Sequence, residues 1–360
     1  MFSFGQMACA PRGPEWNDKE EWNRQVHSFK NWDVYFLCEY AVSLMLHGDG
    51  FPYLFLFEDS KMRMAYVMML NDLSNEDAFK KTFEEGKYLD LTTPYGYGGP
   101  LVEGEYNKNS ILKFVKEMEL YCGKNNIVSQ FFRFAPWMNN QSVLEGVCKK
   151  ILLKNTIYMD TRYGVDIMRN MDTKNRNMVR KALKNGVYVV QDQGRYLNEF
   201  IDIYVETMER DKADRYYFFN KEYYEFLIRE MPENIRFFYA YMNGKMISCA
   251  IILYSDRYAH YHLSGMRTDS RQYGSMNLLL FEAAKWAQEN GKELLHLGGG
   301  VEGEDSLYRF KKQFNKYGQL NYWIGSNIFI SEKFNELVEK RKKLDAKWND
   351  QNNLMIKYRG

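Results

Sequence analysis

The chain has 360 residues, enough for two domains at roughly 150 residues each. Hydrophobic residues make up 45% and charged residues 27%, which excludes wholesale disorder. Lys+Arg number 49 and Asp+Glu 47, so the net charge of +2 excludes a histone-like or polybasic protein but not a local basic groove. Aromatic residues reach 16%, an unusual share that predicts a large ring-rich core.

The sequence lacks the patterns of membrane insertion and export. No run approaches 18 apolar residues, and the first residues lack a basic segment followed by an apolar one, so we expect neither a transmembrane segment nor a signal peptide. Five cysteines (Cys9, Cys38, Cys122, Cys148 and Cys249) are scattered without a CxxC pair. This pattern argues against a disulfide framework or zinc ribbon, and favours mostly free thiols in a reducing cytoplasm.

The first half of the chain reads as a mixture of helices and strands. Residues 1–30 are punctuated by prolines and glycines and are predicted to be loosely held. Beyond Trp32, hydrophobic periodicity predicts helices at 39–46, 75–85 and 111–123, and strands at 51–58, 63–70, 88–92, 127–134 and 151–160.

The second half repeats this mixture. Asn243-Gly244 is a strong hairpin signal between two apolar runs. An amphipathic helix around Phe334 and Leu337 follows the last strand, and the residues from Asn349 onward are predicted to fray. Helices are expected at 172–185, 197–211, 221–231, 275–290 and 304–314, and strands at 187–191, 235–242, 245–254, 257–265, 294–297 and 320–330.

The two halves therefore share an order of elements: helix, antiparallel strands, a glycine-marked loop, helix, strand. We predict an α/β (α+β) fold of two tandem domains, each a mixed sheet flanked by helices. The expected boundaries are 30–163 for the first domain, 164–330 for the second, and 331–360 for a C-terminal helix and tail.

A glycine run, Gly298, Gly299 and Gly300, lies between a predicted strand and a predicted helix. Glycines let a backbone approach a ligand closely and present its N–H groups, although a mobile connector would look the same. The spacing fits neither the Rossmann nor the Walker A pattern.

The helix after the glycine run combines apolar and charged positions. Leu307, Phe310 and Phe314 are spaced to face a core, while Asp305 lies in the first turn, where the helix dipole stabilises a carboxylate. The adjacent Lys311 would bring a cation next to the glycines, where it could stabilise an oxyanion or a phosphate. The alternative interpretation is a solvated charged face.

The first half holds a counterpart loop at residues 93–100, where Tyr95 and Tyr97 alternate with glycines. It is either the wall of a binding site or a tight turn covered by packed tyrosines. Arg133 lies within an apolar strand, where a buried guanidinium would require an acidic partner or a ligand and an exposed one would not.

Two further patterns are weaker. His260, His262 and His296 could hold zinc, but no nearby carboxylate or cysteine completes a ligand set, so we expect no metal. The basic residues Arg176, Arg180 and Lys184 recur along one helix face, and a second basic cluster spans 340–343. Such faces are usually solvated, but either could contact a phosphate backbone.

Taken together, these segments resemble the FemABX-like branch of the GNAT acyltransferase superfamily, including its BioF2-like acetyltransferases. The resemblance spans roughly residues 30 to 330. It is carried by DLTTPYGYGGP at 90–100, FRFAP at 132–136, NRNMVRKA at 175–182, HLGGG at 296–300 and DSLYRFKKQF at 305–314.

The resemblance implies two tandem GNAT folds and the transfer of an acyl or aminoacyl group to an amine. The lysine of the family's FK pair, thought to stabilise the charged intermediate, corresponds to Lys311. Too few residues separate Tyr196 from Asn234 for the family's coiled-coil arm. We therefore expect Lys311 to be catalytic, and substrate to be bound by Tyr95, Tyr97, Gly98, Gly99, Arg133, Arg180, His296, Gly298, Gly299, Gly300, Asp305 and Arg309.

The donor is expected to be an acyl-CoA, with aminoacyl-tRNA as the alternative. Acetyl-CoA-binding relatives use a Q/R-x-x-G-x-G/A loop that opens a helix, and here it places Arg271, Gly274, Ser275 and Asn277 at the donor, with Met276 at the last position of the motif. The acceptor would be an amine of a sugar, a peptide or a cell-envelope (peptidoglycan) precursor. A binding module without catalysis is the remaining alternative.

Overall fold

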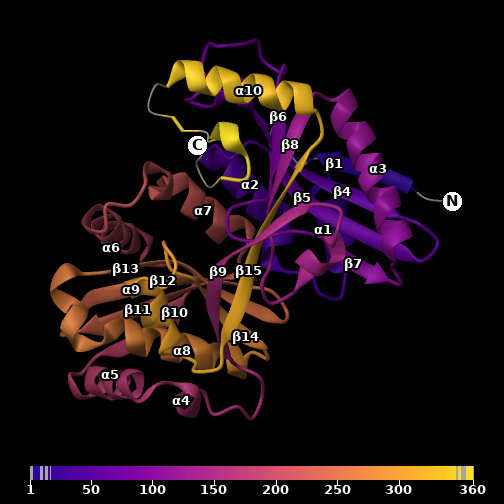
Figure 1. Ribbon diagram of the computed structural model, residues 1–360. Coiled ribbons are helices and arrows are strands. Elements are labelled where there is room, and N and C mark those ends of the chain that lie inside the picture. The colour runs from indigo at the N-terminus through magenta and orange to yellow at the C-terminus, as the bar shows by residue number, and fades with distance from the viewer. Residues whose placement is uncertain are drawn as a thin grey trace. The chain divides into compact units, whose positions relative to one another are not determined.

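The computed structural model describes residues 3–8, 11–12, 15–16, 18–345, 348–349 and 354–359. The chain divides into two compact units (Figure 1). Unit 1 is Met1–Leu153 and Tyr322–Gly360, and unit 2 is Lys154–Asn321. Each unit is a mixed sheet flanked by helices, so the predicted α/β fold class is confirmed.

Unit 1 is built on a sheet with the order β1-β4-β5-β6-β8-β15, in which β7 also pairs with β5. Neighbours are antiparallel except for the parallel pair β6 and β8. Its strands are β1 (Ser3–Ala8), β4 (Phe51–Glu58), β5 (Met62–Asp72), β6 (Leu89–Thr92), β7 (Leu101–Gly104), β8 (Ile127–Arg133) and the later part of β15 (Gln319–Ile328), beside a small hairpin of β2 (Pro11–Arg12) and β3 (Glu15–Trp16).

The helices of unit 1 are α1 (Lys19–His27), α2 (Cys38–His47), α3 (Lys108–Lys124) and α10 (Ser331–Leu344). A capping box between Asn107 and Ser110 starts α3 by satisfying backbone N–H groups of its first turn. Ile111, Phe114 and Met118 recur every three or four residues, so α3 lays one apolar stripe on the sheet.

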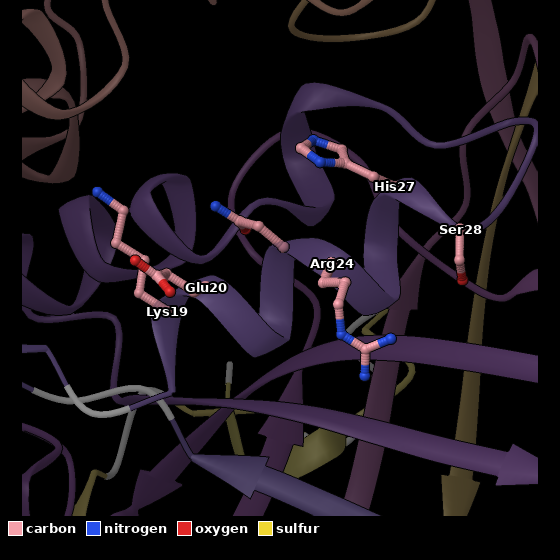
Figure 2. Close-up of a pocket in the computed structure, with 6 residues that line it drawn as sticks. Lys19, Glu20, Arg24, His27 and Ser28 are labelled. Carbon is pink, nitrogen blue, oxygen red and sulfur yellow. The ribbon is translucent and has the colours of Figure 1, made fainter.

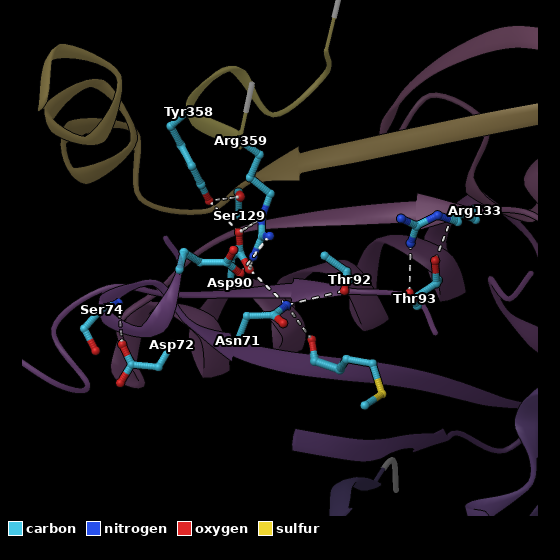
Figure 3. Close-up of polar contacts among 12 residues, drawn as sticks. Asn71, Asp72, Ser74, Asp90, Thr92, Thr93, Ser129, Arg133, Tyr358 and Arg359 are labelled. Carbon is cyan, nitrogen blue, oxygen red and sulfur yellow. Dashed lines mark hydrogen bonds and ion pairs between the residues drawn. The ribbon is translucent and has the colours of Figure 1, made fainter. Parts of the chain in front are cut away.

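The C-terminal residues of unit 1 are anchored by a buried ion pair (Figure 3). Asp90 of β6 is 1% exposed and accepts two hydrogen bonds from the Arg359 guanidinium, at 2.7 and 2.6 Å. The Tyr358 hydroxyl also donates to Asp90 at 2.9 Å and lies 2.7 Å from Ser129 Oγ. Since a buried charge needs both a partner and hydrogen bonds, these contacts fix the short 3₁₀ turn η6 (Lys357–Arg359) on the sheet.

Unit 2 has the sheet order β9-β14-β13-β12-β11-β10, again antiparallel except for one parallel pair, β13 and β14. The turn between β11 and β12 has left-handed Asn243 and Gly244, with φ of 51° and 76°, as an Asn-Gly hairpin requires. Its strands are β9 (Lys149–Asp160, from Lys154 on), β10 (Tyr188–Asp192), β11 (Ile235–Met242), β12 (Lys245–Tyr254), β13 (Tyr258–Met266) and β14 (Leu294–Gly298).

Helices cover both faces of the unit 2 sheet, with α5 and α8 on one side and α6 and α7 on the other (Figure 1). Leu279, Ala283 and Ala287 of α8 are fully buried against the strands, so this helix forms the centre of the unit 2 core. The helices are α4 (Ile167–Asn170), α5 (Thr173–Lys184), α6 (Leu197–Arg210), α7 (Lys221–Glu230), α8 (Ser275–Glu289) and α9 (Ser306–Lys312).

The two sheets have the same sequence of pairings, three antiparallel, one parallel and one antiparallel. In each sheet, the strand that follows the parallel pair is out of sequence order with its neighbours. Ile324–Ile328 of β15 complete the sheet of unit 1, after all of unit 2 in sequence. Ile157–Asp160 of β9 complete the sheet of unit 2, before its other strands.

Several local predictions are wrong. Residues 19–27 form α1 with Trp22 fully buried, so this part of the N-terminal region is not loosely held. The segment 75–85 forms turns instead of a helix, because Phe79 and Phe83 pack on Tyr358 and Tyr88 without regular structure. Residues 354–359 do not fray, since Tyr358 is fully buried.

The cysteine prediction holds only in part. Cys122, Cys148 and Cys249 are free thiols, and burial raises the pKa of Cys148 to about 11, so this thiol stays protonated at neutral pH. Cys38 is disulfide-bonded, which departs from the expected free thiols, and Cys9 lies outside the described residues.

Candidate functional site

The parallel ladder between β13 and β14 ends before either strand does. It consists of three residue pairs and its last is His260 with His296, while β13 continues to Met266 and β14 to Gly298. Beyond this last pair the two strands are no longer joined, and the backbone of β14 enters the glycine loop. We call this point, where the ladder of His260 and His296 ends, the fork of unit 2.

Helix α9 brings Lys311 to the fork. The side chain is only 8% exposed, and its Nζ donates a hydrogen bond of 2.8 Å to the Gly299 carbonyl. The ammonium also lies 5.8 Å from the ring centre of Tyr261 on β13, within cation–π range. Lys311 is therefore a buried cation, not part of a solvated face.

Burial lowers the pKa of Lys311 to about 7, because an ammonium loses hydration inside the protein. The positive charge of Lys154 lowers this pKa further, while the Asp305 carboxylate opposes the shift. Near neutral pH, Lys311 can thus exist in both charge states, a property common among catalytic lysines.

The buried face of α9 differs from the predicted one. Leu307 is exposed, and Tyr308, Lys311 and Phe314 are the buried positions. Spacing every three or four residues fits both sets, so periodicity alone could not choose between them. The prediction that Leu307 faces the core is wrong, because the buried side of the helix is formed by Tyr308 and Lys311.

The geometry of the loop explains why each of these three positions is a glycine. Gly298 has φ of 75°, a left-handed conformation that favours glycine. A Cβ on Gly299 would lie 2.8 Å from the Asn155 carbonyl oxygen of β9, and one on Gly300 would lie 2.2 Å from Asp305 Oδ1. The loop is therefore held tightly, unlike a mobile connector.

Asp305 organises this loop from the start of α9. Its carboxylate accepts from the backbone N–H groups of Val301, Glu302 and Tyr308 at 2.7, 3.1 and 2.8 Å. Asp305 thus acts as an N-cap, and these contacts give it a structural task beside the predicted substrate role. Arg309 is exposed one turn further and donates to the Asp305 carbonyl.

Histidines line the strands behind the fork. His296 is 1% exposed, and burial lowers its pKa well below the usual value, with His260 and Lys311 adding to the shift. Burial likewise lowers the pKa of His262 to about 3, and its Nε2 lies 2.8 Å from the Tyr223 hydroxyl. Both rings are neutral at physiological pH, so the histidines add no positive charge beside Lys311.

The predicted donor loop opens α8. Gly274 has φ of 73°, and a Cβ there would lie 2.7 Å from the Met178 carbonyl oxygen. Ser275 Oγ is buried without a hydrogen-bond partner among the described residues, at a helix start whose first N–H groups lack intrahelical acceptors. Asn277 is occupied differently, because its Nδ2 donates to Asn175 Oδ1 at 2.6 Å.

Met276 does not crowd this helix start. Its side chain is buried in the core, and its sulfur accepts a hydrogen bond of 3.5 Å from the Tyr261 hydroxyl. The exposed Arg271 lies in the preceding 3₁₀ turn η5 (Thr268–Tyr273). The start of α8 therefore combines N–H groups and a buried hydroxyl, with an exposed arginine in the turn before it, a set that fits a phosphate group.

In unit 1, the predicted tyrosine loop is packed into the protein. The ring of Tyr97 contacts those of Tyr35, Trp137 and Tyr322 at centroid distances of 5.6, 5.0 and 5.4 Å. The Tyr95 carbonyl accepts from the Tyr40 hydroxyl at 2.8 Å. These contacts match the interpretation of a turn covered by packed tyrosines.

The glycines of this loop are fixed by Asn140. Its Nδ2 donates to the carbonyls of Gly98 and Pro100 at 2.8 and 3.2 Å. Gly99 has φ of 88°, and a Cβ there would lie 2.9 Å from the same Nδ2 atom. Asn140 is a structural residue that the sequence prediction missed, because the two asparagines after Trp137-Met138 form no distinctive pattern.

Among the residues that the structure describes, Arg133 has no acidic partner, and its side chain is only partly exposed. Its Nη1 donates to the Thr93 carbonyl at 3.0 Å, and its guanidinium lies 5.1 Å from the Phe131 ring centre (Figure 3). In unit 2, Arg180 is exposed on α5 and donates to Asn177 at 3.3 Å. The structure thus places Lys311, His296, Asp305 and the three glycines together, and Tyr95, Tyr97, Gly98, Gly99 and Arg133 in unit 1.

A shallow surface pocket on α1 is a weaker candidate (Figure 2). It is lined by one helix and the residue after it, and both of its basic side chains that carry a fixed charge already have partners, since Lys19 pairs with Glu39 and Arg24 with Glu21. Its lining is Lys19, Glu20, Asn23, Arg24, His27 and Ser28. Within the described ranges, no three His, Cys, Asp or Glu side chains gather as metal ligands.

Comparison with protein families identifies the region around the fork. Residues 169–312 match the family model of the acetyltransferase (GNAT) domain. Unit 2 carries a GNAT domain. No curated protein sequence matches the chain. Across the described part of the chain, no helix has the length and apolar character needed to span a membrane.

Solved structures share the fold of the whole chain at low identity. The structure of FemX has a TM-score of 0.66 at 14% identity and covers 92% of this chain and 99% of its own. A protein of unknown function from Bacteroides thetaiotaomicron has a TM-score of 0.54 at 10% identity and covers 86% and 97%. A C-terminal DUF2156 domain from Agrobacterium fabrum has 0.53 at 12%, and covers 86% and 91%. The expected FemABX-like GNAT fold is confirmed.

Proposed function

We propose that the protein is an N-acyltransferase that moves an acyl group, such as acetyl, from an acyl-CoA to an amine. The observation that carries this proposal is Lys311, a buried ammonium 2.8 Å from the Gly299 carbonyl at the fork. The acceptor class is an amine of a sugar, a peptide or a cell-envelope precursor. We also propose a cytoplasmic location, which the free thiols Cys122, Cys148 and Cys249 support and the disulfide-bonded Cys38 opposes. Cell fractionation with detection of the protein by mass would test it.

The chemistry needs a cation where charge develops. When the acceptor nitrogen attacks the thioester carbonyl, the carbonyl oxygen becomes an oxyanion, and the Lys311 ammonium would stabilise it without giving up its proton. The carbon–sulfur bond then breaks, the sulfur leaves with the electron pair, and the nitrogen loses one proton as the thiolate gains one. The low polarity around Lys311 strengthens this interaction.

The start of α8 supports acyl-CoA as the donor. The orphaned Ser275 hydroxyl, the left-handed Gly274 and the exposed Arg271 fit a pyrophosphate, and Met276 is turned away from them. Helix N-termini hold such anions through N–H groups and the helix dipole. Asn277 would support donor binding through its hydrogen bond to Asn175, not by contact with the donor itself.

Aminoacyl-tRNA is the second candidate donor, as in an aminoacyl-tRNA-dependent transferase acting on a peptidoglycan precursor. Helix α5 has exposed basic residues at Lys174, Arg180, Lys181 and Lys184, with no acidic residue in its sequence. Such a face can contact a phosphate backbone. The fold shared with FemX is compatible with this candidate. A module without catalysis would be favoured by a solvent-directed Lys311, which is buried here.

Parallel assays with the two donors test the proposal. Acetyl-CoA and, separately, charged tRNA are incubated with the protein and a panel of sugar and peptide amines, and products are measured by mass. We expect thiol release and an acylated amine with acetyl-CoA, and loss of both in Arg271→Gln. Product only with charged tRNA, weakened by salt and by Arg180→Gln, would replace the first donor with the second. No product with either donor would favour a binding module.

A further inference from the structure

A second lysine besides Lys311 holds the glycine loop. Lys154, at the start of unit 2 on β9, donates from Nζ to the Gly300 carbonyl at 2.6 Å and to the Val301 carbonyl at 3.2 Å. Lys311 donates to the preceding carbonyl, that of Gly299. Three consecutive carbonyls are thus bound by two ammonium groups from different elements.

The contact between the loop and β9 is close along its length. Asn155, next to Lys154, has its carbonyl oxygen 2.8 Å from where a Cβ of Gly299 would lie. The loop therefore cannot move away from β9 without losing the hydrogen bonds of Lys154, and cannot move toward it without a clash. The distance of the Gly299 carbonyl from β9 is therefore fixed. This carbonyl accepts the hydrogen bond of Lys311.

We propose that Lys154 is a positioning residue, which sets both the place and the charge state of Lys311 through the glycine loop. This role rests on the proposed function of Lys311 in acyl transfer. Sequence patterns do not indicate it, because Lys154 lies in a predicted strand, far from the glycine run.

The charges around Lys311 come from four elements. Lys154 of β9 is a second cation, Asp305 before α9 is an anion, and His296 of β14 and Tyr261 of β13 are neutral at physiological pH. Both lysines are desolvated, and burial also lowers the pKa of Lys154. Since two cations disfavour each other, removing the charge of Lys154 should make Lys311 hold its proton more tightly.

Two variants separate the charge of Lys154 from its hydrogen bonds. Lys154→Gln keeps a donor but removes the charge, and Lys154→Arg keeps the charge. The exposed Lys245→Met on β12 is the matched control. Protein labelled with ¹³C at the lysine Cε carbons is titrated by NMR, with the Lys311 signal assigned by its absence in Lys311→Met.

We expect the Lys311 pKa to rise by roughly half to one unit in Lys154→Gln, and to stay near the wild-type value in Lys154→Arg and Lys245→Met. An unchanged pKa in Lys154→Gln, or an equal rise in Lys154→Arg, would overturn the proposal. This titration needs no substrate, so it stands apart from the proposed function, which fails if Lys311→Met keeps full turnover.

Turnover gives a second readout. If Lys311 acts as an ammonium, the alkaline limb of the pH–rate profile should shift upward in Lys154→Gln by the amount that NMR measures. A loss of rate without a shift of the limb would show that Lys154 has only a structural task, and would contradict the proposed control of charge.

Discussion

The two units have the same order of strand pairings, but they differ in whether backbone hydrogen bonds join the two parallel strands beyond the end of their ladder. In unit 1 the backbone continues to join the strands past the ladder, since Thr93 N–H donates to the Phe131 carbonyl and Gly98 N–H to the Arg133 carbonyl, at 3.1 and 2.7 Å. In unit 2 the ladder stops at His260 and His296.

The two loops also satisfy their carbonyls differently. In unit 1 a neutral amide, Asn140, binds the loop carbonyls, and the rings around Tyr97 fill the space beside them. In unit 2 the ammonium groups of Lys311 and Lys154 donate the hydrogen bonds to the loop carbonyls. The shared fold therefore does not decide the chemistry, because the two units place different side chains on their loop carbonyls.

The comparison first predicts that unit 1 depends on buried charge for stability. Arg359→Met leaves Asp90 buried without its cation and should lower the free energy of unfolding by about 3–5 kcal/mol. Denaturant unfolding measures this loss. The control Arg229→Met removes a surface pair with Glu230 in unit 2 and should cost at most about 1 kcal/mol. Equal losses would show that the Asp90 contacts are not what holds unit 1.

The second prediction concerns the fork of unit 2. Lys311→Met keeps the length of the buried side chain but removes its charge, and should lower kcat by roughly 10²–10³-fold. Circular dichroism should show an intact fold. The neighbouring Lys312→Met, at an exposed position of the same helix, should keep wild-type turnover. If both variants lose turnover equally, the fork is not the reacting centre.

The third prediction concerns the loop of unit 1. Asn140→Ala leaves two loop carbonyls without their donor and should cost about 1–3 kcal/mol of unfolding free energy. The adjacent, more exposed Gln141→Ala serves as the control. Thermal and denaturant unfolding report the difference. A neutral Asn140→Ala would mean that the tyrosine rings alone keep this loop in place.

The fourth prediction follows from the Lys311 pKa of about 7. If the ammonium is the active form, turnover is full below this pKa and falls about tenfold per unit as the pH rises above it. A weakly basic amine acceptor avoids a second titration in this range. Turnover that instead rises through pH 7 would assign Lys311 the role of a general base.

The smallest effect is expected for Arg133. Arg133→Met removes a hydrogen bond to Thr93 and a contact with Phe131, and should cost about 1 kcal/mol. Turnover should change little, and it is measured in parallel with the turnover of Arg180→Gln. A severe loss of turnover with unchanged stability would instead support the predicted substrate role of Arg133.

Strong local patterns predicted most elements well. The hairpin of β11 and β12 follows from Asn243-Gly244, and α8 from its apolar stripe. The sequence also singled out the glycine run and Lys311, because glycines beside a cation are a distinctive combination, and their role stays a prediction. The orientation of α9 was missed, since Leu307 and its neighbour Tyr308 can each begin a stripe spaced every three or four residues, and only packing selects the one that is buried.

Long-range contacts escaped prediction for a physical reason. The partners of Asp90 lie near the other end of the chain, at Tyr358 and Arg359, and nothing local marks them as a pair. Lys154 and the glycine loop are likewise far apart in sequence. A single sequence records local preference well, but such tertiary pairings only indirectly.

The late position of β15 in the sequence has a consequence for synthesis on the ribosome. The edge of β8 that receives Ile324–Ile328 is made before unit 2, whereas those residues are made after it. At 5–20 residues per second, the sheet of unit 1 would wait about 10–40 s for its final strand. During that time β8 presents open backbone groups, a hazard for aggregation. Unit 2 already has its early strand β9 when β14 emerges, so its sheet can close first.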